Sequence, residues 1–135
     1  MSDFIVDASV AVKWFVAEMD SLVADELSAP RLIITEVANV LCRKAMTGLM
    51  TTLEARHYFR SLPHYLDGII AIDELIEPAL VNACALQRPI YDLIYLEAAR
   101  RLDAQLVTAD RRFASKIAGT DFARQVTLLS DWRPE

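Results

Sequence analysis

The chain has 135 residues, of which 54% are hydrophobic and 24% charged, with only three glycines and five prolines. A chain of this length and composition builds a packed core, so we expect a single domain over residues 1–135 and exclude a linker or a disordered tail. Fourteen basic and 19 acidic side chains give a net charge of −5, which argues against a broad nucleic-acid-binding surface but permits local basic patches.

The sequence carries no pattern typical of a membrane protein or of a disulfide framework. The N-terminus has no basic segment before an uninterrupted apolar stretch, and no window reaches the ~20 apolar residues of a membrane span. We therefore expect a soluble cytoplasmic protein that does not engage a membrane. Cys42 and Cys84 lie inside apolar helical patterns and form neither a CxxC pair nor a zinc-binding set, so both are expected in the core.

Short apolar runs alternate with helical patterns along the chain. The first half predicts a strand at 4–6 and helices at 9–15, 21–27, 35–46 and 52–62. The second half predicts strands at 68–72, 105–107 and 126–129, and helices at 74–87, 91–102 and 111–117. Apolar strands that alternate with helices predict an α/β fold, a three-layer α/β/α sandwich with a central parallel sheet of four to five strands.

Four acidic residues are expected near the carboxyl ends of the strands, the edge at which parallel sheets bind ligands. Asp7 ends the first strand, Asp110 follows the strand at 105–107, and Glu36 and Asp92 begin helices whose N-termini should face the same edge. Taken singly, each acid also fits a helix cap or a first-turn position that the helix dipole favours.

Four carboxylates at one edge would repel one another strongly. Two of them ~5 Å apart cost about 3 kcal/mol at an effective dielectric of about 20, and several such pairs sum to about 10 kcal/mol. Raised pKa values, salt bridges to arginine or a hard divalent cation would offset this repulsion. Carboxylate oxygens without His or Cys suit Mg²⁺ or Mn²⁺ better than zinc, and such a site points to phosphodiester hydrolysis.

The segments FIVDASVAVKWF, TEVANVLCR, YDLIYLEAA and LVTADRRF, in this order and at these separations, resemble the motifs of PIN-domain nucleases, in particular those of VapC-type toxins. The resemblance covers essentially the whole chain. It implies a metal-dependent endoribonuclease in which Mg²⁺ or Mn²⁺ is bound by Asp7, Glu36, Asp92 and Asp110. It also implies that Ser9 and Thr108 support these acids through hydroxyl hydrogen bonds.

The same resemblance implies a substrate and partners. Structured RNA, such as tRNA or ribosomal RNA, would be cut to leave 5′-phosphate products. The activity would be inhibited by a cognate VapB-like antitoxin, and the chain would form a homodimer.

Two segments depart from the family's usual pattern. The segment QRPIYD ends at Asp92, and many relatives carry a glycine and a serine before its tyrosine, so we expect a stiffer loop there. Glu97 occupies a position that is small or apolar in the family. It follows Asp92 by five residues, about 140° around a helix, so we expect it on the surface and not among the ligands.

Cations near the acid motifs are candidates for contacts with the RNA backbone. They are Lys13, Arg43, Lys44, Arg111 and Arg112. Asn39 shares a helical face with Glu36 and Arg43 and is a candidate supporting residue. His57 and His64 are far from every acid motif in sequence, so we expect them at the surface or an interface and not in catalysis.

Two other functions stay open. One is a PIN-like scaffold that binds RNA or protein without cutting it; the other is a metal-dependent phosphatase or receiver-like domain. The sequence DAS after the first strand lacks the second acid of a DxD phosphatase motif, and the adjacent acidic pair of receiver domains is missing. Glycine patterns for nucleotide phosphates and the nucleophile elbow are also absent from the sequence.

Overall fold

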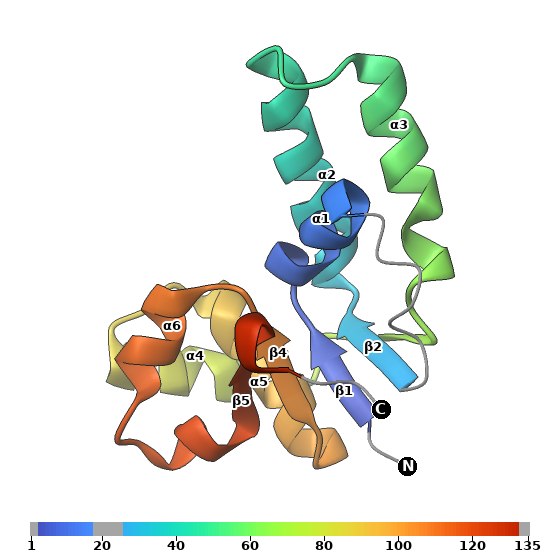
Figure 1. Cartoon of the computed structure of the whole chain (residues 1–135). Helices are drawn as coiled ribbons and strands as arrows, with labels where there is room; N and C mark the ends of the chain where they lie inside the picture. Colours follow the sequence, from blue (N-terminus) through green and yellow to red (C-terminus); the bar gives the residue numbers. More distant parts are fainter. Residues whose placement is uncertain (1–2, 18–25, 133–135) are drawn as a thin grey trace.

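A five-stranded parallel sheet forms the centre of the fold in this computed structural model, which describes residues 3–17 and 26–132 (Figure 1). The strands are β1 (Asp3–Val6), β2 (Glu26–Pro30), β3 (Gly68–Ile70), β4 (Gln105–Thr108) and β5 (Val126–Leu128). Their order is β3-β2-β1-β4-β5, and each neighbouring pair is parallel. The predicted α/β class with a central parallel sheet is confirmed.

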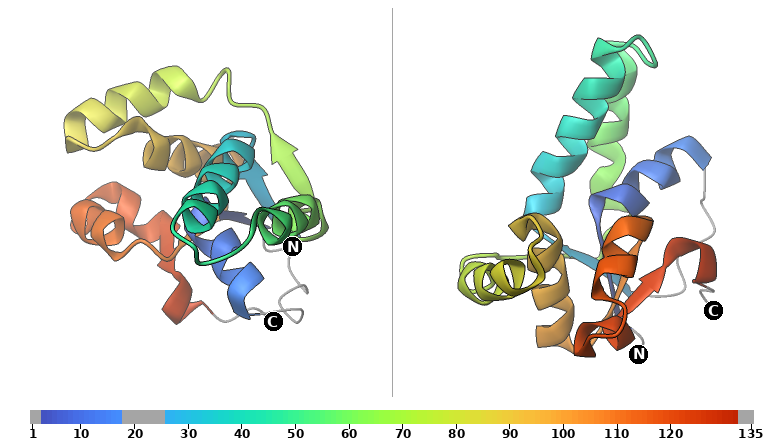
Figure 2. Two further views of the ribbon diagram at one scale, coloured as in Figure 1. Left: turned by 90° about the horizontal axis from the view of Figure 1, so that it is seen from above. Right: turned by 90° about the vertical axis from the view of Figure 1, so that its left-hand side faces the viewer.

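Helices cover both faces of this sheet. The α-helices of the described part are α1 (Ala8–Ala17), α2 (Leu32–Met46), α3 (Thr52–Ser61), α4 (Ile76–Leu86), α5 (Ile90–Leu102) and α6 (Arg111–Ile117). Short 3₁₀ turns lie at Leu62–His64, Asp121–Gln125 and Leu129–Asp131. Both views of Figure 2 show α4 and α5 on the side of the sheet opposite to α1, which gives the three-layer arrangement that the sequence predicts.

The helices α2 and α3 form an antiparallel pair that rises above the carboxyl ends of the strands (Figure 1). The start of α3 is fixed by a capping box, in which the Glu54 amide donates to the Thr51 hydroxyl and the Thr51 amide donates to the Glu54 carboxylate, both at 3.0 Å. Because α2 begins just after the carboxyl end of β2 and carries Glu36, the helix pair lies at the same edge of the sheet as the acidic motifs.

The helix α5 is the central helix of the core. Its residues 93–99 are all buried, because the helix packs on β1, β2 and β4 and is covered by α4. Glu97 belongs to this run with only 8% of its surface exposed, so its expected surface position is wrong. Its carboxylate lies 3.4 Å from Arg100 and 3.9 Å from Arg101, and these two cations offset the cost of burying the charge.

Strand β2 occupies part of the segment for which the sequence predicts a helix at 21–27. Residues 26 and 27 belong to the strand, and 21–25 lie outside the described residues. Leu27 and Ala29 point into the core, while the backbone pairs with β1 on one side and β3 on the other. Tertiary pairing therefore overrides the local helical preference of this segment.

Helix α2 begins earlier than the sequence predicts. It starts at Leu32 and not after Thr35, because the chain turns directly after Pro30, and the Arg31 amide donates to the Ile70 carbonyl of β3. Glu36 consequently lies in the second turn of the helix, not in its first.

Both cysteines are exposed, so their predicted core positions are wrong. In each case the preceding residue takes the inward position: Leu41 is buried before Cys42, and Ala83 is buried before Cys84. One step along a helix turns a side chain by about 100°, enough to take each thiol out of the core.

Within the described residues, none of the helices has both the length and the apolar character needed to cross a lipid bilayer.

Candidate active site

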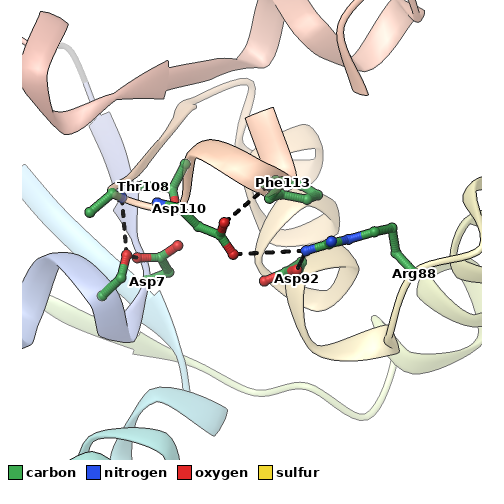
Figure 3. Close-up of polar contacts among 8 residues, drawn as sticks. Asp7, Arg88, Asp92, Thr108, Asp110 and Phe113 are labelled. Carbon is green, nitrogen blue, oxygen red and sulfur yellow. Dashed lines mark hydrogen bonds and ion pairs between the residues drawn. The ribbon is translucent and has the colours of Figure 1, made fainter. Parts of the chain in front are cut away.

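Three of the predicted carboxylates lie at the edge of the sheet where the central strands end. Asp7 directly follows β1, and Asp110 follows the adjacent strand β4 after one residue, with Val6 in register with Val107. Asp92 comes from the first turn of α5. Figure 3 shows these three side chains turned toward one another, so segments far apart in the sequence are brought together here.

Asp7 is the most buried of these acids, with 8% of its surface exposed. It also caps α1, because its Oδ1 accepts a hydrogen bond from the Val10 amide at 3.2 Å. Burial raises the pKa of its carboxyl to about 6; hydrogen bonds with the Ser9 and Thr108 side chains and with the Val10 amide counteract this, and the charge of Asp92 adds to it. Asp7 is thus held in surroundings that disfavour its charge.

Ser9 and Thr108 connect Asp7 to the end of β4. The Ser9 hydroxyl donates to Asp7 Oδ1 at 2.5 Å and accepts from the Ala109 amide at 3.0 Å. Thr108, fully buried, forms a side-chain hydrogen bond with Asp7, and its hydroxyl accepts from the Asp110 amide at 3.0 Å. These contacts fix the position of Asp7 relative to the turn that carries Asp110.

Glu36 is held by a residue that the sequence analysis did not single out. The buried Tyr95 of α5 donates its hydroxyl proton to Glu36 Oε1 at 2.6 Å. Burial raises the pKa of Glu36, Tyr95 lowers it and the charge of Asp92 raises it further. The tyrosine pKa is itself raised, by burial and then by the hydrogen bond to Glu36, so Tyr95 stays protonated and acts as a donor.

A second residue that the sequence analysis did not single out, Arg88, lies between two of the acids. Its Nη2 is 2.7 Å from Asp92 Oδ2 and 3.8 Å from Asp110 Oδ2 (Figure 3). Burial raises the pKa of Asp92, and Arg88 counteracts that shift through a hydrogen bond and its charge, while the charge of Asp110 adds to it. Asp110 also caps α6, since its Oδ1 accepts from the Phe113 amide at 3.1 Å.

The four acids fit a hard divalent cation by donor chemistry. They offer carboxylate oxygens only, and the charge of Asp92 contributes to the raised pKa of both Asp7 and Glu36. As they stand, no three His, Cys, Asp or Glu side chains of the described ranges are grouped closely enough to hold a metal ion. Tyr95 contacts a carboxylate oxygen of Glu36, and Arg88 contacts one of Asp92. A bound cation would therefore have to bring the four carboxylates closer together.

The candidate RNA-contacting residues do not form one cluster. Lys13 and Arg111 line a hollow of about 250 Å³ with Ala109, directly beside the Asp110 turn. Arg112 follows on the exposed side of α6, whereas Arg43, Lys44 and the exposed Asn39 lie on α2. His57 and His64 are exposed, as expected.

A groove of about 480 Å³ runs between α2 and α3. Its lining is mainly apolar and includes Ala38, Leu41, Ala45, Met46 and Phe59. Further apolar side chains, at Leu49 and Leu53, are exposed near the end of this helix pair.

Comparison with known proteins finds a similar sequence and several solved structures with a similar fold. No protein-family model matches the sequence. The chain is 29% identical over 121 residues to "Ribonuclease VapC3" of Pyrobaculum aerophilum, an alignment that covers 83% of this chain and 92% of the relative. The crystal structure of PAE2754 from the same organism superposes with a TM-score of 0.77 at 21% identity, covering 96% of this chain and 90% of that one. A toxin–antitoxin complex from Klebsiella pneumoniae superposes with a TM-score of 0.62 at 15% identity over 91% and 94% of the two chains.

The parallel sheet and its strand order belong to a fold that this chain shares with these solved structures. The resemblance of the four motifs to VapC-type proteins is confirmed by the similarity of the chain to Ribonuclease VapC3.

Proposed function

We propose that this protein is a Mg²⁺- or Mn²⁺-dependent endoribonuclease that cuts structured RNA, with tRNA or ribosomal RNA as the expected targets, and that it is the toxin of a toxin–antitoxin pair. The observation that carries the proposal is that Asp7, Asp92 and Asp110 lie at one edge of the sheet, where the charge of Asp92 also acts on Glu36. The likeness to a protein named a ribonuclease supports the reaction class.

Asp7, Glu36, Asp92 and Asp110 are the residues that would hold the cation. When bound, a divalent cation supplies an acidified water and neutralises charge on phosphate oxygens. Ser9 and Thr108 orient Asp7 for this task, and Tyr95 holds one oxygen of Glu36 while leaving the other available.

The basic residues near the acids suggest how RNA is bound, and the position of the histidines suggests which product is formed. Lys13 and Arg111 flank the acid edge and are placed to bind RNA phosphates, with Arg112, Arg43 and Lys44 as further candidates. Neither histidine belongs to the acid site, so we expect hydrolysis that leaves a 5′-phosphate and not a cyclic 2′,3′-phosphate. This activity would take place in the cytoplasm, where the target RNAs are.

The proposed protein partners are a VapB-like antitoxin and a second copy of the chain. One structural neighbour is a toxin–antitoxin complex, which supports the first partner. The apolar groove between α2 and α3 is the candidate antitoxin surface, since an apolar helix face or extended segment would bury Met46 and Phe59 there.

The decisive experiment incubates purified protein with total RNA in Mg²⁺, Mn²⁺ or EDTA. The Asp92→Asn variant tests the site, and Asp121→Asn is a matched control, because Asp121 is exposed and lies near the opposite ends of the strands, before β5. We expect discrete fragments with 5′-phosphates from the wild type and the control, and none in EDTA or from Asp92→Asn. Intact RNA under every metal condition, together with retained RNA binding, would contradict the nuclease and favour a non-cleaving scaffold.

A further inference from the structure

Arg88 is a cation that the fold builds into the acid site. It stands in the connection between α4 and α5, where Gln87 adopts a left-handed conformation with φ 56° and Pro89 caps α5. The Arg88 amide donates to the Ala83 carbonyl at 3.1 Å, which ties the connection to the last turn of α4. The backbone around the arginine is therefore fixed by a helix end on each side.

The side chain extends from this connection to two of the four carboxylates. Besides its contacts to Asp92 and Asp110, the guanidinium lies 5.8 Å from the centre of the Phe113 ring, a distance typical of a cation–π contact. Only 20% of the side chain is exposed. Three groups from α5, α6 and the β4–α6 turn thus hold the guanidinium in place (Figure 3).

This position brings the arginine into conflict with a bound cation. An oxygen that accepts from Arg88 at 2.7 Å directs one lone pair at the guanidinium, which makes it a weaker ligand for a metal ion. A divalent cation beside the guanidinium would also be repelled, and the repulsion is strong in a partly buried site. Carboxylates that share an arginine are therefore a weaker metal site than the same carboxylates alone.

We propose that Arg88 is a resident counter-ion that competes with the divalent cation for Asp92 and Asp110, and that it releases at least one of them when the cation binds. This inference rests on the proposed function, since it assumes that the four acids are the metal ligands. The released guanidinium retains its charge, and its buried Nε has no hydrogen-bond partner among the described residues, so it keeps donor capacity for an incoming phosphate oxygen.

The test measures Mn²⁺ binding by isothermal titration calorimetry without RNA. Arg88→Gln removes the cation, and Arg124→Gln is the matched control, because it removes the same charge from an exposed residue near the amino end of β5. We expect Arg88→Gln to bind Mn²⁺ about tenfold more tightly than the wild type, since one positive charge leaves a partly buried site, and Arg124→Gln to bind as the wild type does.

Thermal unfolding gives a second readout. In EDTA, Arg88→Gln should melt below the wild type, because its acids lack their counter-ion, and it should gain more from added Mn²⁺ than the wild type gains. If the variant does not fold, the wild-type protein is titrated with Mg²⁺ instead. The NMR signal of the Arg88 Nε–H group should then shift, and the shift should reach half its final size at the Mg²⁺ concentration that half-saturates the metal site.

The outcomes separate this inference from the function on which it rests. Equal or weaker Mn²⁺ binding by Arg88→Gln, or an Arg88 signal that does not move as wild-type protein saturates with Mg²⁺, would overturn the competition and leave the nuclease proposal intact. No binding of either metal by wild type or variant, together with intact RNA, would overturn the metal site and the competition together.

Discussion

Replacing Asp7 by Asn should stabilise the metal-free protein at neutral pH while it abolishes RNA cleavage. Asp7 is buried at 8% exposure, and its pKa is raised from 3.8 to about 6, chiefly because burial disfavours the carboxylate. Asparagine has the same shape, caps a helix equally well and can accept the hydrogen bonds from Ser9 and Val10. It lacks the charge whose burial costs stability.

The size of the effect follows from the pKa. A rise of about two units corresponds to roughly 3 kcal/mol at about 1.4 kcal/mol per unit. Between 3.8 and about 6 the folded protein holds a proton on Asp7 that the unfolded chain has lost, so the free energy of unfolding falls as pH rises through this window. The variant does not titrate here. The free energy of unfolding of Asp7→Asn should therefore exceed that of the wild type by almost nothing at pH 4 and by up to about 3 kcal/mol at pH 7.5.

The assay is urea unfolding, followed by circular dichroism at pH 4 and pH 7.5 in EDTA. Asp121→Asn, at an exposed position, should change stability little at either pH. The reasoning is refuted if Asp7→Asn is no more stable than the wild type at pH 7.5, or if the difference between the two proteins is the same at both pH values.

Two further predictions concern hydrogen bonds near and far from the acids. Tyr95→Phe removes the donor to Glu36 at 2.6 Å, which should cost about 1–2 kcal/mol in urea unfolding. Because Tyr95 lowers the pKa of Glu36, its loss should also move the acidic limb of the cleavage pH profile upward, and an unchanged profile would contradict a role for this contact. Thr51→Ala breaks the capping box of α3 and should cost about 1 kcal/mol in the same assay. Its cleavage rate should equal that of the wild type, because Thr51 belongs to the α2–α3 connection, and Figure 1 shows this connection at the end of the helix pair far from the sheet. A large loss of cleavage would count against the proposed location of the site.

The sheet and the positions of Asp7 and Asp110 follow from local sequence. A parallel sheet places the carboxyl ends of its strands at one edge, so an acid directly after an apolar run can be located without knowing the packing. Asp7 and Asp110 satisfy that condition, and β1 and β4 are indeed adjacent. Strand β2 could not be located in this way, because residues 26–30 form a strand through pairing with β1 and β3 and not through their own pattern.

Burial on α5 was not predictable from its periodicity. A helix against a sheet normally shows one apolar face, yet residues 93–99 are buried all round because α4 covers the outer side. Glu97 and Tyr95 are polar members of this run: the partners of Glu97 lie at i+3 and i+4 on its own helix, whereas only the folded chain brings the partner of Tyr95 near. For Glu97 the partners are Arg100 and Arg101, while Tyr95 meets Glu36, 59 residues away in the sequence.

Arg88 shows the same limit within the acid site. The sequence analysis named three ways to offset carboxylate repulsion: raised pKa values, salt bridges to arginine and a divalent cation. The structure uses the first two together. The pKa values of Asp7, Glu36 and Asp92 are raised, and an arginine lies between Asp92 and Asp110. Arg88 stands between the left-handed Gln87 and the Pro89 cap; its i,i+4 spacing to Asp92 is visible in the sequence, but its contact to Asp110 follows from no spacing rule. A metal ion would supply the third way. Because these three ways draw on the same carboxylate oxygens, the affinity of the site for its cation should depend on Arg88 as well as on the acids themselves.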